Sequence, residues 1–313
     1  GIYGHCSAAP GQHFVEISAT VLKSLLVSYM ICVFLAFLSR QLHTPTNFFV
    51  LSLAVSDFFV GLLMFFQIML IDGCWLLGNL MCVVYQYLSY IITSASVGTM
   101  VLICVDRYVA ICDPLHYPTK VTQKRVQVYV CLCWTCSVIY SGLLLKDNLE
   151  QPGRHISCSG ECVVVGNYIA GVADLVLSFI GPVIVIIFLY MRVFVVAVSQ
   201  ARAMRSHIAT VTLQCSVSVT VKKSELKAAL TLGVVVVVFL ICLCPYYTFI
   251  VILTTQDTSI SASSAASVIC LFYFNSCLNP VIYAFFYPWF RKCVKAIVTL
   301  QILQPDSSEA NIL

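Results

Sequence analysis

Seven apolar stretches, each long enough to cross a lipid bilayer, constrain this chain more than any other feature. About 20 mainly apolar residues let a helix span the hydrocarbon layer, where only helices and closed barrels satisfy every backbone hydrogen bond. The stretches cover residues 19–38, 48–70, 83–111, 126–145, 168–190, 228–253 and 265–286. The sequence therefore predicts an all-α membrane protein, a seven-transmembrane helix bundle.

The distribution of charge predicts how this bundle lies in the membrane. Nearly all Lys and Arg residues follow the first, third, fifth and seventh stretches, whereas the opposite side has only Lys146 and Arg154. Because Lys and Arg accumulate in cytoplasmic loops, we expect an extracellular amino terminus and a multi-pass plasma-membrane protein. The net charge of +4 expresses this asymmetry and requires no nucleic-acid partner.

The third stretch carries polar side chains on one helical face. Ser89, Thr93 and Ser96 are followed on the same face by Met100, Ile103 and Arg107, in steps of four, three, four, three and four residues. Lipid cannot satisfy hydroxyl or guanidinium groups, so this stripe should face protein. We expect this helix to lie at the centre of the bundle.

Two acids lie inside the predicted membrane spans. A charge at the bilayer centre costs at least about 2.5 kcal/mol, so Asp57 in the second stretch and Asp174 in the fifth both need a partner, a cation or a proton. Ser178 lies one turn from Asp174 on the same face. Either acid could instead be structural and hydrogen-bonded to a neighbouring span. If Asp174 is isolated, it favours a site for a small amine, whose ammonium supplies the countercharge.

Aromatic residues of the third, sixth and seventh stretches lie at a similar depth and could line this site. Each aromatic face adds about 0.5–2 kcal/mol when a cation lies over it; the alternative is ordinary packing between helices. These residues are Tyr90, Tyr246, Tyr247, Phe272 and Tyr273.

The second half of the chain carries signals for bending and for docking. Pro245 removes one backbone hydrogen bond from the sixth stretch and predicts a hinge there. The basic segment between the fifth and sixth stretches should extend both helices into the cytosol. After the seventh stretch, an amphipathic basic segment predicts a short helix on the membrane surface, with Cys293 as a lipidation site. We therefore divide the chain into an extracellular amino terminus (1–16), a seven-helix domain (17–286) and an amphipathic helix with a cytoplasmic tail (287–313).

Several motifs together resemble those of rhodopsin-like G-protein-coupled receptors. Asp106-Arg107-Tyr108 ends the third stretch, and residues 279–283 read NPVIY. Asp57, Trp134 and Pro182 occupy further motif positions. Within that superfamily, residues 275–290 (NSCLNPVIYAFFYPWF) and the loop 158–162 (CSGEC) resemble the trace-amine-associated receptors. The resemblance implies a receptor for trace or volatile amines, olfactory in role, that acts through a stimulatory G protein and cyclic AMP.

The resemblance also implies roles for particular residues. Disulfides are expected for Cys82 with Cys162 and for Cys6 with Cys158. A sodium site would comprise Asp57, Ser96, Asn275, Ser276 and Asn279. The amine site would comprise Ser89, Tyr90, Thr93, Asp174, Ser178, Tyr246, Tyr247, Phe272 and Tyr273. The activation switch would comprise Asp106, Arg107, Tyr108, Tyr190, Glu225, Phe239, Pro245 and Tyr283, with an ion pair between Arg107 and Glu225 at rest.

The chain departs from the family pattern at several positions. Aminergic receptors have an Asp where this chain has Ser89; a branch expanded in fishes resembles this chain in moving the acid to the fifth span, here Asp174. Tyr29 and Leu243 replace the usual Asn and Trp. An alternative reading is therefore a ligand-silent receptor of the same fold with reduced G-protein activation.

Other classes of membrane protein fit the sequence less well. An opsin needs a Lys in the seventh stretch for its Schiff base, and residues 265–286 contain none. A secondary transporter would show internal repeats. All six histidines lie outside the seven stretches, so no His-based catalytic or metal cluster is expected within the membrane. We expect no enzymatic activity and no cofactor other than a sodium ion.

Overall fold

The computed structural model describes residues 45–71, 75, 77–151, 162, 168–208, 216–255, 262–286, 295 and 299. These residues contain helices for six of the seven predicted stretches, and five segments are long and apolar enough to cross a membrane. The helices are α2 (Pro45–Ile71), α3 (Gly78–Cys112), α5 (Gln123–Leu144), α7 (Tyr168–Asp174), the π-helical turn η2 (Leu175–Ile180), α8 (Gly181–Ile208), α9 (Ser216–Thr255) and α10 (Ala262–Phe286). The first stretch and the predicted amino-terminal segment 1–16 lie outside the described residues.

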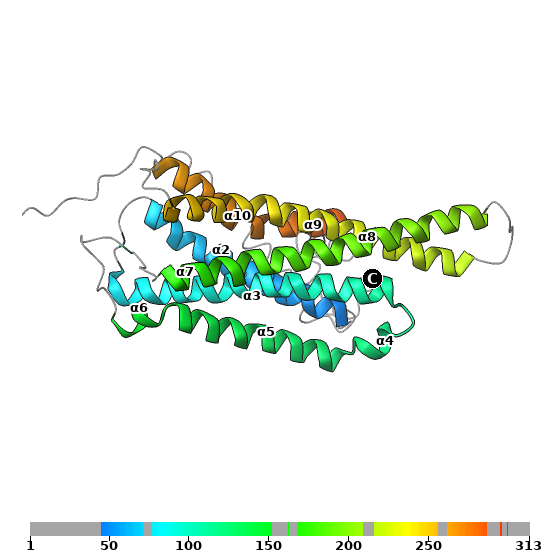
Figure 1. The fold of residues 1–313 in the computed structure, drawn as a ribbon, viewed down its shortest axis with the longest axis horizontal. Helices are drawn as coiled ribbons and strands as arrows, with labels where there is room; N and C mark the ends of the chain where they lie inside the picture. Colours follow the sequence, from blue (N-terminus) through cyan, green and yellow to red (C-terminus); the bar gives the residue numbers. More distant parts are fainter. Residues whose placement is uncertain are drawn as a thin grey trace, which may run out of the picture.

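Helix α3 occupies the centre of the bundle, as the polar stripe predicts. It packs against α2, α5, α8 and α9, and Figure 1 shows it between α5 on one side and α9 and α10 on the other. Ser96, Met100 and Ile103 on the stripe are buried, and Ser89 and Thr93 are half-buried. The stripe therefore faces protein, and the same face leads from one end of the bundle to the other.

The core lies where α2, α3, α8 and α9 meet. Leu53, Met100, Ile186 and Phe239 come from these four helices and are among the most completely buried side chains. The outward faces of α5 and α8 remain apolar and exposed, as at Ile139 and Phe188. Exposed apolar faces on long helices are what a lipid-facing surface requires.

Helix α5 approaches α3 closely because one side chain is missing at their interface. A Cβ atom on Gly98 would lie 2.6 Å from Cys133 Sγ, so only glycine fits there without displacement. Trp134 Nε1 donates to Ser52 Oγ at 3.1 Å, and Ser52 Oγ lies 3.2 Å from Thr99 Oγ1. These hydroxyls join α5, α2 and α3 into one unit.

Helices α8 and α9 continue past the rest of the bundle, as Figure 1 shows. The predicted extension of both helices into the basic segment is confirmed, and α9 runs through Pro245 without a break. Beyond α10, only Lys295 and Thr299 are described, and Thr299 N donates to Lys295 O at 2.9 Å with helical spacing. Cys293 and the rest of the predicted amphipathic helix lie outside the described residues.

One end of the bundle is marked by a disulfide. Cys82, near the start of α3, is bonded to Cys162 with a Cα–Cα distance of 5.5 Å, which confirms the pairing that the resemblance implied. Cys6 and Cys158 lie outside the described residues. We call this end, where α3 begins and α5 ends, the disulfide end, and the opposite end the Arg107 end.

Candidate functional site

Asp174 ends α7 at the disulfide end, immediately before η2. Ser178 Oγ donates to Asp174 Oδ1 at 2.8 Å, and the Tyr140 hydroxyl of α5 donates to the same oxygen at 3.0 Å. The acid is thus hydrogen-bonded to a neighbouring span. Hydroxyl groups do not neutralise a carboxylate, however, and among the residues that the structure describes no Lys, Arg or His forms an ion pair with Asp174.

A row of aromatic rings runs from this acid across three helices. Phe179 of η2 stacks on Tyr247 of α9 with a centroid distance of 4.4 Å, and Tyr246 lies 4.4 Å from Phe272 of α10. Edge-to-face contacts at 5.3 and 5.4 Å continue the row from Tyr247 to Tyr246 and from Phe272 to Tyr273. The structure therefore brings four predicted lining residues together, and they also pack on one another.

The far end of this row returns to α3 through hydroxyl groups. Ser89 Oγ lies 3.1 Å from the Tyr273 hydroxyl, which is 3.4 Å from the hydroxyl of Tyr85. Tyr85 in turn donates to Gln67 Oε1 at 2.6 Å. This side of the site is polar but carries no charge on any of these four groups.

Tyr90 and Thr93 complete the predicted set on α3, where both are half-buried. Tyr90 and Tyr246 each lie near enough to both Asp174 and Tyr273 to interact with them electrostatically. The arrangement is an acid at one side, aromatic rings beside it and neutral hydroxyls opposite. It is chemically suited to a small organic cation.

A second group of buried polar residues includes Asp57 and its partner Asn279. Asn279 Nδ2 donates to Asp57 Oδ2 at 2.8 Å, and both residues are buried. Ser96, Asn275 and Ser276, the other predicted members, are buried as well. The side-chain oxygens of Asn275 and Asn279 receive no hydrogen bond within the described part of the chain. Such an oxygen-only set fits a small hard cation such as sodium.

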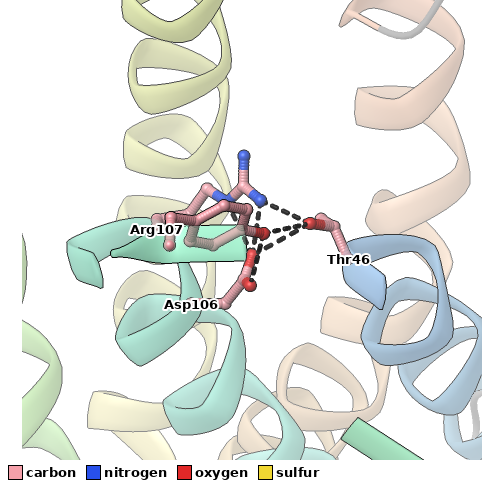
Figure 2. A network of polar contacts seen from close by, with 4 residues as sticks. Thr46, Asp106 and Arg107 are labelled. Carbon is pink, nitrogen blue, oxygen red and sulfur yellow. Dashed lines mark hydrogen bonds and ion pairs between the residues drawn. The ribbon is translucent and has the colours of Figure 1, made fainter. Parts of the chain in front are cut away.

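A third polar network lies at the Arg107 end of the bundle. Figure 2 shows Asp106 and Arg107 of α3 beside Thr46, at the start of α2. Arg107 pairs with buried Asp106 and donates through Nη2 to Thr46 Oγ1 at 2.6 Å. Thr46 and the Tyr117 hydroxyl donate to the two oxygens of Asp106 at 3.2 and 2.9 Å. These contacts join α2, α3 and the short helix α4 (Tyr117–Lys120).

The other predicted switch residues are less completely described. Tyr190 lies against Gly233 of α9, because a Cβ atom at Gly233 would overlap the Tyr190 hydroxyl. Phe239 is buried in the core, and Tyr108 packs at the edge of a small cluster around Val193. The side chains of Glu225 and Tyr283 lie outside the described residues, so the expected Arg107–Glu225 ion pair remains a prediction.

The turn between α3 and α4 is held by charges of its own. Lys120 Nζ lies 2.8 Å from Asp113 Oδ2, and His116 Nδ1 lies 2.7 Å from Asp113 Oδ1. Hydrogen bonds from these two side chains lower the pKa of Asp113 to about 2. Asp113 is therefore negatively charged at every physiological pH. Its contacts with His116 and Lys120 stabilise the turn that precedes Tyr117 and α4.

Comparison with known proteins identifies the family. Residues 28–283 match the model of the 7 transmembrane receptor (rhodopsin family). Trace amine-associated receptor 13c of Danio rerio is 37% identical over 284 residues, covering 87% of this chain and 82% of that protein. Trace amine-associated receptor 4 of Mus musculus is 33% identical over 285 residues, and receptor 9 of Rattus norvegicus is 37% identical over 280; they cover 87% of this chain and 81% and 83% of their own lengths. The chain belongs to the trace amine-associated receptor family.

Membership in this receptor family settles several expectations from the sequence. The chain is a G-protein-coupled receptor and not an enzyme, and its fold is a seven-helix bundle. Together with the apolar helices, the family indicates a multi-pass protein of the plasma membrane.

Sequence reasoning missed several residues of this receptor's networks. Tyr140 and Phe179 adjoin the Asp174 site, and Thr46 and Tyr117 complete the Asp106 network. One signal for Tyr140 was present, since a hydroxyl in an apolar span needs a partner. Nothing in the local pattern identified Asp174 as that partner, because the two residues belong to different helices.

Proposed function

We propose that this receptor binds a small protonated amine at Asp174 and signals through a stimulatory G protein to cyclic AMP. The observation that carries the proposal is a carboxylate whose partners, in the described part of the chain, are two hydroxyl groups and no basic side chain. Placing an unpaired charge in a membrane bundle is costly, and such residues mark functional sites by default.

An alkylammonium ion would supply both a countercharge for Asp174 and a cation for the aromatic rings beside it. Its charge would pair with Asp174, and the ammonium would lie over a ring of the aromatic row that includes Tyr246, Tyr247 and Phe272. Ser89 and Tyr273 on the opposite side are neutral and bonded to each other. The amine would therefore be anchored from the fifth span and not from the third.

The proposed signalling direction follows from the chemistry of the two ends. Disulfides persist in oxidising surroundings, which favours an extracellular position for the Cys82–Cys162 end. Lys120, Lys124 and Arg125 lie at the opposite end, as expected for a cytoplasmic face. The G protein would then engage the Arg107 end, beside the long extensions of α8 and α9.

A panel of amines tests this function. Cells that express the full-length receptor with a cyclic AMP reporter would receive primary, secondary and tertiary alkylamines over a range of concentrations, with cells lacking the receptor as the control. We expect a saturable, receptor-dependent rise in cyclic AMP for at least one of them. A flat response to the whole panel, in cells with verified surface receptor, would instead support the ligand-silent alternative.

The olfactory role has a test of its own. Receptor transcript in olfactory sensory neurons would support that role, and absence of the transcript from these neurons would contradict it.

A sodium ion at the Asp57 cluster belongs to the same proposal. The oxygens of Asp57, Asn275 and Asn279 would hold it, and its charge would stabilise the resting arrangement of α2, α3 and α10.

We expect purified receptor to unfold at a higher temperature in sodium chloride than in choline chloride of equal ionic strength. An ion present at about 100 times its dissociation constant adds about 2.7 kcal/mol of stability. Asp57→Asn should abolish this difference, whereas Asp174→Asn should keep it. Equal unfolding temperatures for the wild type in the two salts would contradict a sodium site.

A further inference from the structure

The two oxygens of Asp174 have different surroundings. Both hydroxyl donors, from Ser178 at 2.8 Å and from Tyr140 at 3.0 Å, converge on Oδ1. No side chain in the described part of the chain donates to Oδ2. Asp174 as a whole is half-buried. The described residues therefore donate to one oxygen of Asp174 and not to the other.

The geometry limits how the hydrogens can be shared. Tyr140 and Ser178 also lie 3.0 Å from each other, so three contacts compete for two hydroxyl hydrogens. A hydrogen bond to a charged acceptor is about twice as strong as one between neutral groups. Both hydrogens are therefore best used on Asp174. Because a carboxylate oxygen has about two acceptor positions, Oδ1 is then fully occupied.

Tyr140 reaches this carboxylate from a well-supported helix. Helix α5 packs closely against α3 at Gly98 and Cys133, and Trp134 donates a hydrogen bond to Ser52 of α2. Ser178, by contrast, belongs to the same turn as Asp174 and moves with it. Tyr140 is consequently the contact that sets the orientation of the carboxylate relative to the rest of the bundle.

We propose that Tyr140 is a positioning residue that commits Oδ1 of Asp174 to the protein and leaves Oδ2 as the single acceptor for one N–H of the ligand. This inference rests on the proposed amine function and narrows its ligand class. A primary, secondary or tertiary alkylammonium needs one acceptor oxygen. A guanidinium binds best in a bidentate arrangement, with one N–H to each carboxylate oxygen. Because Oδ1 is already occupied, this site disfavours a guanidinium ligand.

The first arm of the test measures selectivity. The probes are an alkylamine that activates the wild type and the alkylguanidine with the same chain, each read as a cyclic AMP dose-response curve. In Tyr140→Phe we expect the alkylamine EC50 to rise about 10-fold, as for loss of one hydrogen bond to a charged group. The alkylguanidine EC50 should not rise, so the preference for the amine falls by about the same factor.

A matched control separates positioning from packing. Tyr87 also donates its hydroxyl across the α3–α5 interface, to Val138 O at 3.2 Å, and does not contact Asp174. Tyr87→Phe should retain the wild-type preference between the two probes. The inference is overturned if Tyr140→Phe also retains that preference, or if both probes weaken together.

The second arm needs no ligand. Unfolding temperatures of purified wild type, Tyr140→Phe, Asp174→Leu and the double variant form a cycle that isolates the coupling between the two side chains. We expect Tyr140→Phe to destabilise the wild type but to have little further effect in the Asp174→Leu background. Additive effects would show that Tyr140 does not act through Asp174. If no amine activates the wild type, the proposed function fails, while this cycle still decides the role of Tyr140.

Discussion

Asp174→Asn should abolish the response to amines while the receptor still reaches the cell surface. The substitution keeps the size of the side chain and can still accept the hydroxyls of Tyr140 and Ser178, so the local packing should survive. It removes the negative charge that the ligand's ammonium pairs with. Removing one partner of a buried charge pair costs about 3–5 kcal/mol, which corresponds to a loss of affinity of more than about 100-fold.

The measurement is a cyclic AMP dose-response curve normalised to receptor at the surface. Asp147→Asn is the matched control, since it makes the same chemical change on an exposed acid of α6 (Lys146–Glu150) at the disulfide end. We expect the control to respond like the wild type. A wild-type EC50 in Asp174→Asn would show that the amine is anchored elsewhere and would withdraw the site assignment.

Replacing Cys82 or Cys162 by alanine should sharply reduce delivery of the receptor to the cell surface. Their disulfide joins positions 80 residues apart and ties the loop before α7 to the start of α3. Loss of a native disulfide typically costs about 2–5 kcal/mol, a large part of the stability of most folded domains. Most of the variant protein should therefore be retained inside the cell.

Surface labelling of an epitope-tagged receptor, compared with its total amount, measures this loss. Cys136→Ala is the control, because Cys136 is a free cysteine on the exposed face of α5. It should traffic normally. Normal surface levels of Cys82→Ala and Cys162→Ala would mean that folding does not depend on the bridge.

Different kinds of interaction explain which features could be predicted. The spans, their order and the central place of α3 follow from hydropathy and from helical periodicity, which are local properties of the chain. The acids Asp57 and Asp174 stood out for a similarly simple reason, since a charge within an apolar stretch needs compensation. Two contacts on acids could not be found in the same way. Tyr140 lies 34 residues from Asp174 and Thr46 lies 60 residues from Asp106, so both contacts depend on how separate helices pack.

The sequence by itself determined that this chain is a membrane-spanning helical bundle, that it resembles amine receptors and that an acid, Asp174, lies within the fifth span. Only the tertiary structure decided that the hydroxyl groups of Tyr140 and Ser178 converge on one oxygen of Asp174, Oδ1. The physical reason is that hydropathy acts on each helix separately, whereas the direction of a carboxylate depends on hydroxyl groups brought to it by the packing of α5 against α3.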